Sequence, residues 1–379
     1  DVPPLRFPEF SGEWKCTTIG NIGDIKNGPF GSVLHAEDYV ENGIPIVTTE
    51  HFKTGLMPSD KFGIPQVSNE DYIRLKGYRL ETNDIVFSRV GSVDINAHVG
   101  IEQNGWLFSG RVLRVRPKYD IDSLFLHYAL STEAVKRDIR NRAVGQTMPS
   151  INTPILSSTT IQLPKDLFEQ KKVAHFLRLL DERIITQNKI IEKLQSLIKG
   201  IAQHCIKEST SGNTYVKLGD ICQITTGKLD ANAQVDNGIY PFFTCAEQPF
   251  KIDSFAFDTE ALLISGNGAN LGYINYYKGK FNAYQRTYVL DLFSENIQYI
   301  KWALKVLLPK RIAIEKSSSN TPYIVLSTLT DLRLPIPCKS KQSFIANLMQ
   351  SLERKLSNQI AQYDSYNYLK QYLLRQMFI

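Results

Sequence analysis

The sequence of 379 residues predicts an α+β protein built as a tandem duplication, in which a mixed α/β domain followed by a long helix occurs twice. Three observations lead to this prediction. An opening motif recurs, similar blocks follow it in the same order in both halves, and each half closes with heptad-spaced apolar residues. We expect a first domain over 1–164, a helix over 165–208, a second domain over 209–337 and a second helix over 338–379.

The opening motif is TIGNIGDIKNG from Thr18 to Gly28, and it returns as KLGDICQITTG from Lys217 to Gly227. Both copies have two glycines eight residues apart and an Ile three residues before the second glycine. Matching blocks follow in order: GIPI (43–46) with GIYP (238–241), DIVFS (84–88) with ALLIS (261–265), HYAL (127–130) with KWAL (301–304), TMPSI (147–151) with NTPYI (320–324), and Leu163-Pro164 with Leu334-Pro335. The offset between the halves falls from 199 (219 minus 20) to 172 (342 minus 170), so the first half carries 27 additional residues.

Each half follows the same order of elements. Gly, Pro and Asn separate β-branched and aromatic runs such as DIVFSRV, RVLRVRP and RTYVLDL, which predicts short strands. A helix is then expected over SLFLHYALSTEAVKRDIRNR in the first half and over IQYIKWALKVLLPKRIAI in the second. The long helix comes last.

The long helices show apolar residues in alternating steps of three and four, which is the spacing of a coiled-coil seam. A polar glutamine occurs at the matching position of both seams, and Lys370 interrupts the second one. We expect the two helices to pair as an antiparallel coiled coil; the alternative is that each packs only on its own domain. The seam residues are Leu177, Leu180, Ile184, Gln187, Ile191, Leu194, Ile198, Ile201 and Cys205 in the first helix, and Met349, Leu352, Leu356, Gln359, Tyr363, Tyr366, Lys370, Leu373 and Met377 in the second.

Composition and charge exclude several classes of protein. The chain is 42% hydrophobic and 22% charged, which is typical of a globular protein, and no apolar run is long enough for a membrane span. The start, DVPPLRFPEF, lacks the pattern of a secretory signal. Five scattered cysteines favour free thiols in a reducing compartment, so we expect a cytoplasmic protein. The net charge of +6 slightly favours an anionic partner.

Three motifs resemble catalytic or cofactor sites, but each has a simpler interpretation. SGNGANLG (265–272) precedes a strand-like run, whereas a nucleotide loop must open a helix. NTPY (320–323) resembles the NPPY motif of adenine methyltransferases, but no S-adenosylmethionine loop precedes it. DLFEQK (166–171) contains the Asp, Glu and Lys of a metal-dependent nuclease, but these residues begin a helix, and Asp166 and Glu169 fit a helix capping box. The six histidines have no metal-ligand spacing. We therefore expect no catalytic centre, metal or cofactor in this chain.

Positive charge recurs near the end of the shorter helix in both halves. Lys136-Arg137 aligns with Lys310-Arg311 at an offset of 174 (310 minus 136). A charge run is often a solvated helix face, but a basic patch kept in both halves of a diverged duplication favours a common polyanion. We predict that these residues contact DNA phosphates. The full basic set is Lys136, Arg137, Arg140 and Arg142 in the first half and Lys310, Arg311 and Lys316 in the second.

The order of domain, helix, domain and helix resembles the specificity (S) subunit of a type I restriction–modification system over essentially the whole chain. The resemblance rests on the openings WKCTTIGNIGDIKNG and YVKLGDICQITTG and on the closings GQTMPSINTPILSSTTIQLP and SSSNTPYIVLSTLTDLRLPIP. It also rests on the helices EQKKVAHFLRLLDERIITQNKIIEKLQSLIKGI and KQSFIANLMQSLERKLSNQIAQYDSYNYLKQYLLRQM.

This resemblance implies that the two domains are target-recognition domains, each reading one half of a split duplex DNA sequence. The helices would space the domains and dock two methyltransferase (M) subunits. Those subunits would supply S-adenosylmethionine, and restriction/motor (R) subunits, which use ATP and Mg, would join them to cut DNA. The chain itself would be non-catalytic.

Base contacts are expected from polar residues in glycine-punctuated loops. Because the bodies of the two domains differ, the two half-sites should differ and the target should be asymmetric. The 29 helical residues from Leu177 to Cys205 would span about 43 Å, more than one DNA turn of about 35 Å. Two alternatives remain: a stand-alone methyltransferase or nuclease, and a scaffold that binds acidic proteins. The candidate base contacts are Lys26, Asn27, Arg89 and Gln146 in domain 1, and Lys228, Asn267, Gln285 and Arg286 in domain 2.

Overall fold

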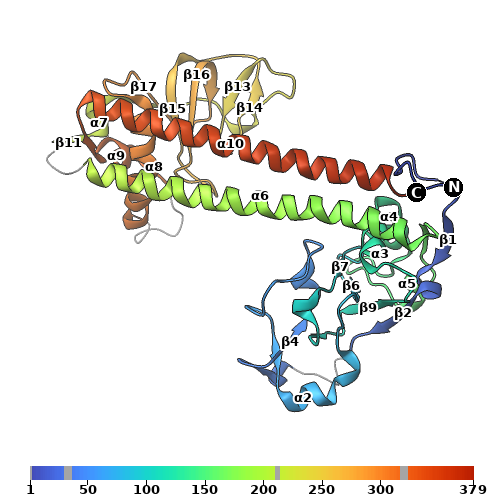
Figure 1. The fold of residues 1–379 in the computed structure, drawn as a ribbon. Helices are drawn as coiled ribbons and strands as arrows, with labels where there is room; N and C mark the ends of the chain where they lie inside the picture. Colours follow the sequence, from blue (N-terminus) through green and yellow to red (C-terminus); the bar gives the residue numbers. More distant parts are fainter. Residues whose placement is uncertain (1, 30–35, 210–213, 316–322) are drawn as a thin grey trace. The chain divides into compact units, whose positions relative to one another are not determined.

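The computed structural model divides the chain into two compact units (Figure 1). Unit 1 comprises Asp1–Gln187 and Gln362–Ile379, and unit 2 comprises Asn188–Ala361. Each unit contains a mixed α/β body and a part of each long helix. The structure describes residues 2–29, 36–209, 214–315 and 323–379.

The described residues of unit 1 form two four-stranded sheets and one additional strand pair. The first sheet has the order β2-β9-β6-β7 and is antiparallel throughout; its strands are β2 (Gly23–Asn27), β6 (Ile85–Ser88), β7 (Asn96–His98) and β9 (Val112–Pro117). The second has the order β3-β5-β4-β8, with β4 and β8 parallel; its strands are β3 (Tyr39–Val40), β4 (Ile44–Val47), β5 (Gln66–Val67) and β8 (Leu107–Phe108). The additional pair joins β1 (Lys15–Thr18) to β10 (Thr160–Leu163). The helices are α1 (Ile19–Ile22), α2 (Asn69–Arg74), α3 (Ser123–Leu130), α4 (Glu133–Arg142) and α5 (Thr153–Ser157).

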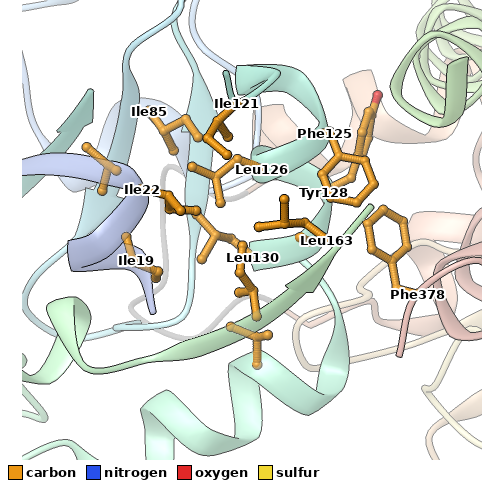
Figure 2. Packing of buried hydrophobic residues seen from close by; sticks show 14 of the residues in the cluster. Ile19, Ile22, Ile85, Ile121, Phe125, Leu126, Tyr128, Leu130, Leu163 and Phe378 are labelled. Atoms are coloured by element: carbon orange, nitrogen blue, oxygen red, sulfur yellow. The ribbon is translucent and has the colours of Figure 1, made fainter. Parts of the chain in front are cut away.

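The core of unit 1 forms around α3. Asp122 caps this helix by accepting a hydrogen bond from the Phe125 N–H at 2.8 Å. Figure 2 shows Phe125 beside Phe378, which follows the last helix, and the two rings lie 5.1 Å apart between centroids. Leu130 and Ile85 are fully buried in the same cluster. Burial of each such side chain stabilises the fold by about 1.5–3 kcal/mol.

Unit 2 contains one six-stranded sheet with the order β12-β17-β15-β16-β13-β14. Its strands are β12 (Gln223–Thr226), β13 (Tyr240–Phe243), β14 (Phe250–Ile252), β15 (Phe257–Ser265), β16 (Ile274–Ala283) and β17 (Thr287–Asp291). A separate pair joins β11 (Thr214–Lys217) to β18 (Arg333–Ile336), as β1 joins β10 in unit 1. The helices are α7 (Leu218–Ile221), α8 (Ile297–Glu315) and α9 (Leu326–Thr330).

The strand registers fix the correspondence between the two units. In unit 1, Ile85 of β6 pairs with Val115 of β9. The equivalent pair in unit 2 is Leu262 of β15 with Leu290 of β17. The residue numbers therefore differ by 177 between β6 and β15 and by 175 between β9 and β17. The predicted match of DIVFS with ALLIS, which has an offset of 177, is confirmed.

Most of the additional residues of the first repeat lie between β4 and β6. The parallel pairing of Ile46 with Leu107 corresponds to that of Phe242 with Asn282, which gives an offset of 196 (242 minus 46). Because the offset falls to 177 at β6, this interval holds 19 of the 27 additional residues (196 minus 177). They contribute β5 and α2 to unit 1, whereas the corresponding interval of unit 2 contains β14.

A buried glutamine occupies the same position in both repeats, at the start of each long helix. Gln170 accepts a hydrogen bond from the Asp122 N–H at 2.9 Å, and Gln342 accepts one from the Asn296 N–H at 3.0 Å. Each side chain also donates to a proline carbonyl, at 3.0 and 2.9 Å. The predicted alignment of Gln342 with Gln170 is confirmed by these equivalent contacts.

The predicted capping box at the start of the first long helix is wrong in one part. Asp166 does accept a hydrogen bond from the Phe168 N–H, at 2.8 Å. Glu169, however, is only 2% exposed, and its carboxylate accepts from Arg6 Nε at 2.7 Å and from Trp14 Nε1 at 3.1 Å. This carboxylate therefore ties the N-terminal segment to the helix and does not cap it.

The long helices are α6 (Leu167–Glu208) and α10 (Lys339–Gln376), drawn in green and red in Figure 1. All eighteen predicted seam residues are buried or half-buried. Within unit 1, Leu177 and Leu373 belong to one core cluster, and within unit 2 Ile198 and Met349 belong to another. Among the described residues, no helix is both long enough and apolar enough to cross a membrane.

The seam lysine has an acidic partner. Lys370 Nζ lies 2.5 Å from a carboxylate oxygen of Asp181 on α6, and Tyr128 of α3 donates its hydroxyl to the other oxygen at 2.7 Å. The Lys370 ammonium also lies 5.7 Å from the centre of the Tyr128 ring. A lysine at this position of α10 is therefore paired within unit 1, and it does not leave an uncompensated charge in the seam.

His127 of α3 is buried and hydrogen-bonded. Its Nδ1 lies 2.6 Å from Asn96 Oδ1, and the side chain is 5% exposed. Burial, with smaller contributions from the charges of His98, Lys370 and Lys136, lowers the pKa of His127 to about 3. The folded protein therefore keeps this imidazole neutral through the mildly acidic range.

We predict that acid destabilises the protein partly through His127. An unfolded histidine binds a proton near pH 6.5 while the folded one does not until about pH 3, so the free energy of unfolding falls as the pH drops through this window. Between pH 7 and pH 5 the loss should be about 2 kcal/mol. Urea unfolding at both pH values should show a smaller loss in His127→Gln than in the parent protein. The same loss in both proteins would contradict this assignment, and His204→Gln, at an exposed position, is the control.

Candidate nucleic-acid interface

The four candidate base contacts of domain 2 come from three loops that meet at one end of the six-stranded sheet. The Gln285 N–H donates to the carbonyl of Leu229, next to Lys228, at 2.9 Å. The Gly266 N–H donates to the carbonyl of Arg286 at 2.8 Å, and Gly266 precedes Asn267 in the chain. Lys228, Gln285 and Arg286 are exposed. The structure therefore gathers polar and cationic side chains that are as much as 58 residues apart (286 minus 228).

Cys245 orders the loop that carries Asn267. Its thiol donates to Asn267 Oδ1 at 3.1 Å, and its carbonyl accepts a hydrogen bond from Asn270 Nδ2 at 3.0 Å. Asn267 is half-buried, so its side chain is held by the loop before any ligand binds. Such pre-organisation reduces the entropy lost on binding.

In domain 1 the equivalent end of the sheet gathers fewer free side chains. Arg89 donates Nη1 to the carbonyl of Gly110 at 3.1 Å, so this arginine supports the neighbouring turn. Asn27 ends β2 at the same edge and is half-buried. Gln146 is exposed on a loop that the Gly91 N–H joins to this edge through the Pro149 carbonyl, at 2.8 Å. Asn27 and Arg89 therefore lie at one edge of the sheet, and the loop that carries Gln146 is joined to the same edge.

Lys26 has a different environment. Its ammonium lies 5.1 Å from the centre of the Tyr78 ring, and the side chain is half-buried. Side chains alternate between the two faces of a strand, so Lys26 and Asn27 face opposite sides of β2. Lys26 is therefore less suited than Asn27 to act with the loops.

Two of the predicted phosphate contacts of α4 have structural partners. Arg140 pairs with Asp94 at 2.5 Å and also with Glu133, and these hydrogen bonds raise the pKa of Arg140. Arg142 donates to the carbonyl of Ile155 at 3.0 Å and pairs with an aspartate one turn earlier on α4. These arginines hold α4 against the loop after β6 and against α5.

Two of the remaining basic residues, one on each helix, are more available. Arg137 and Lys310 are exposed, and neither has an ion-pair partner within the described part of the chain. Lys136 is half-buried, and Arg311 pairs with Glu315 at 2.8 Å. Lys316 and the residues 320–322 of the NTPY motif lie outside the described residues.

The predicted alignment of Lys136-Arg137 with Lys310-Arg311 is shifted by one residue. Unit 1 breaks its helix between α3 and α4, whereas α8 continues without a break. After the break, Arg142 contacts α5 at Ile155 and Glu315 contacts α9 at Thr328, which gives an offset of 173 for both partners. Arg137 therefore corresponds to Lys310. These two exposed residues form the matched basic position.

The basic helices pack against the loops in each unit. In unit 1 the Arg140–Asp94 ion pair joins α4 to the loop after β6. In unit 2 a Cβ atom placed on Gly272 would lie 2.7 Å from Ile312 Cδ1, so α8 packs directly on the loop after β15. Each unit thus presents a helix with an exposed cation beside a group of loops with polar side chains, an arrangement suited to a charged polymer.

The structure offers a simpler role for the residues of SGNGANLG. The loop lies between β15 and β16, so no helix begins at its glycines to bind a phosphate. Within the described ranges, no group of three or more His, Cys, Asp or Glu residues is arranged to hold a metal ion.

The chain matches the family described as "Type I restriction modification DNA specificity domain" twice, at residues 11–196 and 210–363. It is 44% identical over 137 residues to the type I restriction enzyme EcoDI specificity subunit of Escherichia coli. This alignment covers 36% of this chain and 30% of that protein. It is also 24% identical over an alignment of 399 residues to the MjaVIII specificity subunit of Methanocaldococcus jannaschii, covering 92% and 87% of the two chains.

Two solved structures have a similar fold. The S subunit of the type I restriction–modification system from M. genitalium superposes with a TM-score of 0.69 at 18% identity, covering 100% of this chain and 99% of that one. A chain from a study of the assembly and conformational transition of the type I restriction–modification system gives a TM-score of 0.59 at 17% identity, covering 99% of both chains. These TM-scores show a shared fold, and at sequence identities this low they show the fold alone.

We predict that the arginines of α4 divide into structural and free side chains. Arg142→Ala should lower the free energy of unfolding by about 1–2 kcal/mol, because it leaves polar groups of α5 without their charged partner. Arg137→Ala, on the same helix, should change it by no more than about 0.5 kcal/mol. Denaturant unfolding of both variants checks this difference. Equal losses would mean that Arg142 does not secure α4 to α5.

Proposed function

Because the chain belongs to the type I restriction modification DNA specificity family, whose domain it contains twice, we propose that it reads an asymmetric two-part duplex DNA target, one part with each unit. The observation that supports this most strongly is the repeated surface. In both units the same strand ends, turns and helix meet, while the loop side chains differ. A shared framework with different side chains suits two similar tasks on two different base sequences.

Arg137 and Lys310 are the best remaining candidates for phosphate contacts on the helices. They are exposed, occupy equivalent positions and lie on the helix beside the loops. The candidates for base contacts in unit 2 are Asn267 and Gln285. In unit 1 they are Asn27 and the exposed Gln146 of the same group of loops. Asparagine and glutamine can pair in two places with adenine.

The long helices are proposed to pair as an antiparallel coiled coil that spaces two recognition domains. The complete burial or half-burial of the seam supports this, as do the α6 and α10 residues that share a core within each unit. The Asp181–Lys370 ion pair adds a directional contact. On this proposal the recognition domains are 1–164 and 209–337, and the spacer helices are 165–208 and 338–379.

The same helices are proposed to dock two methyltransferase subunits, through which restriction subunits join. In unit 1 an apolar groove of about 560 Å³ runs between α6 and α10. Phe176, Leu179 and Leu369 line it and are 40%, 45% and 42% exposed. Exposed apolar patches of this kind mark protein interfaces. S-adenosylmethionine, ATP and Mg would be used by those partners, in the cytoplasm where the DNA lies.

We predict that the purified chain transfers no methyl group by itself. Labelled methyl transfer from S-adenosylmethionine to DNA should require both this chain and its methyltransferase subunit, since the proposed function assigns the chemistry of transfer to the partner. Transfer by the rigorously purified chain alone would contradict this and favour a stand-alone enzyme. The absence of salt-dependent DNA binding by the assembled complex would instead favour a scaffold.

The spacer helices should determine the gap between the two half-sites. Deleting one heptad from each helix, 184–190 and 356–362, keeps the seam in phase and removes about 10.5 Å of helix. That length equals about 3 base pairs at 3.4 Å each. Methylation mapping should find the same two half-sites with a shorter gap, or a collapse of activity if DNA twist prevents both domains from docking. An unchanged gap at full activity would show that the helices do not set the spacing.

A further inference from the structure

A tight turn with an arginine in its third position leads into the same strand in both units. The turns are 109–112, before β9, and 284–287, before β17. In each, the last N–H donates to the first carbonyl, at 3.0 and 2.8 Å respectively, which closes a four-residue turn. The third residues are Arg111 and Arg286. Their offset of 175 equals the offset of the strands that follow.

The surroundings of the two turns are also equivalent. Three backbone hydrogen bonds hold each turn. The carbonyl of the arginine accepts a hydrogen bond from an N–H of the loop after β6 in unit 1 or after β15 in unit 2. The N–H of the first turn residue donates to a carbonyl at the end of β4 or β13, and the N–H of a glycine after β2 or β12 donates to the carbonyl of the last turn residue. In unit 1 these bonds are Arg89 to Arg111 (3.0 Å), Ser109 to Val47 (2.9 Å) and Gly28 to Val112 (3.1 Å); in unit 2 they are Gly266 to Arg286 (2.8 Å), Tyr284 to Phe243 (2.9 Å) and Gly227 to Thr287 (3.3 Å).

The backbone of each arginine is thus fixed, while its side chain is free. Arg111 and Arg286 are exposed, and within the described residues neither guanidinium has an ion-pair partner. The arginines nearby differ in this respect. Arg89 is bonded to a carbonyl, and Arg140 is bonded to two carboxylates.

The residues beside the two arginines do not match. The turn of unit 1 reads Ser-Gly-Arg-Val and that of unit 2 reads Tyr-Gln-Arg-Thr. Two half-sites of different sequence still share one feature, which is the phosphate backbone. A side chain that is the same in both units suits this shared feature, whereas unmatched neighbours such as Gln285 suit bases.

We propose that Arg111 and Arg286 each bind a DNA backbone phosphate, at the corresponding place in the two half-sites. The proposal deepens the proposed function and rests on it. It assigns Arg111, which the sequence patterns did not single out, and it moves Arg286 from the expected base contacts to the phosphate contacts. A fixed backbone with a free guanidinium positions one charge-assisted contact per half-site and orients the neighbouring loops on the groove.

The test uses the full chain assembled with its methyltransferase subunits. Binding is measured by fluorescence anisotropy over a series of salt concentrations. One duplex contains the sequence that the complex methylates, and the other contains the same bases in scrambled order. Arg111→Ala and Arg286→Ala should each weaken binding to both duplexes by roughly tenfold or more. Each should also lower the slope of log affinity against log salt by about one. Arg111→Lys and Arg286→Lys keep the charge and should retain the slope.

Lys15→Ala and Arg333→Ala are matched controls, because both residues are exposed on the strand pairs that open and close the repeats. They should bind like the parent complex. A slope for the turn variants equal to that of the controls overturns the proposal. An altered methylated sequence also overturns it, because that result would make these arginines base readers. If the parent complex shows neither salt-dependent binding nor a preferred sequence, the proposed function itself fails.

Discussion

Both recognition surfaces depend on the same constraint. In each unit, one glycine lies very close to a backbone carbonyl group. A Cβ atom on Gly28 would lie 1.9 Å from the carbonyl oxygen of Ser109, and one on Gly227 would lie 1.9 Å from that of Ala283. Any side chain at either glycine would push the neighbouring turn, 109–112 or 284–287, away from the sheet. The last glycine of each opening motif is therefore the reason why the turn, the adjacent loops and the basic helix can meet at one edge.

The duplicated framework has backbone contacts that are the same in both units and side chains that differ between them. The backbone contacts of the turns at Arg111 and Arg286 are equivalent, whereas the neighbouring side chains and the segment between β4 and β6 differ.

The features that the sequence predicts are periodic or locally repeated. The heptad seam and the equivalent strands DIVFS and ALLIS depend on short-range patterns, and the burial and register of these residues agree with the patterns. The partner of Glu169 is Arg6, which lies 163 residues away, so the local capping pattern led to a wrong assignment. Arg111 was missed because the offset between halves changes along the chain, and only the sheet register identifies its counterpart. The helix break after α3 likewise shifts the match of Arg137.

Methylation sequencing of DNA from cells that express the chain together with its methyltransferase subunit tests the central claim most directly. Two different recognition surfaces on one framework predict a single methylated sequence made of two unlike half-sites separated by a constant gap of unspecified bases. A contiguous sequence, two identical half-sites, or methylation that does not depend on this chain would contradict the account.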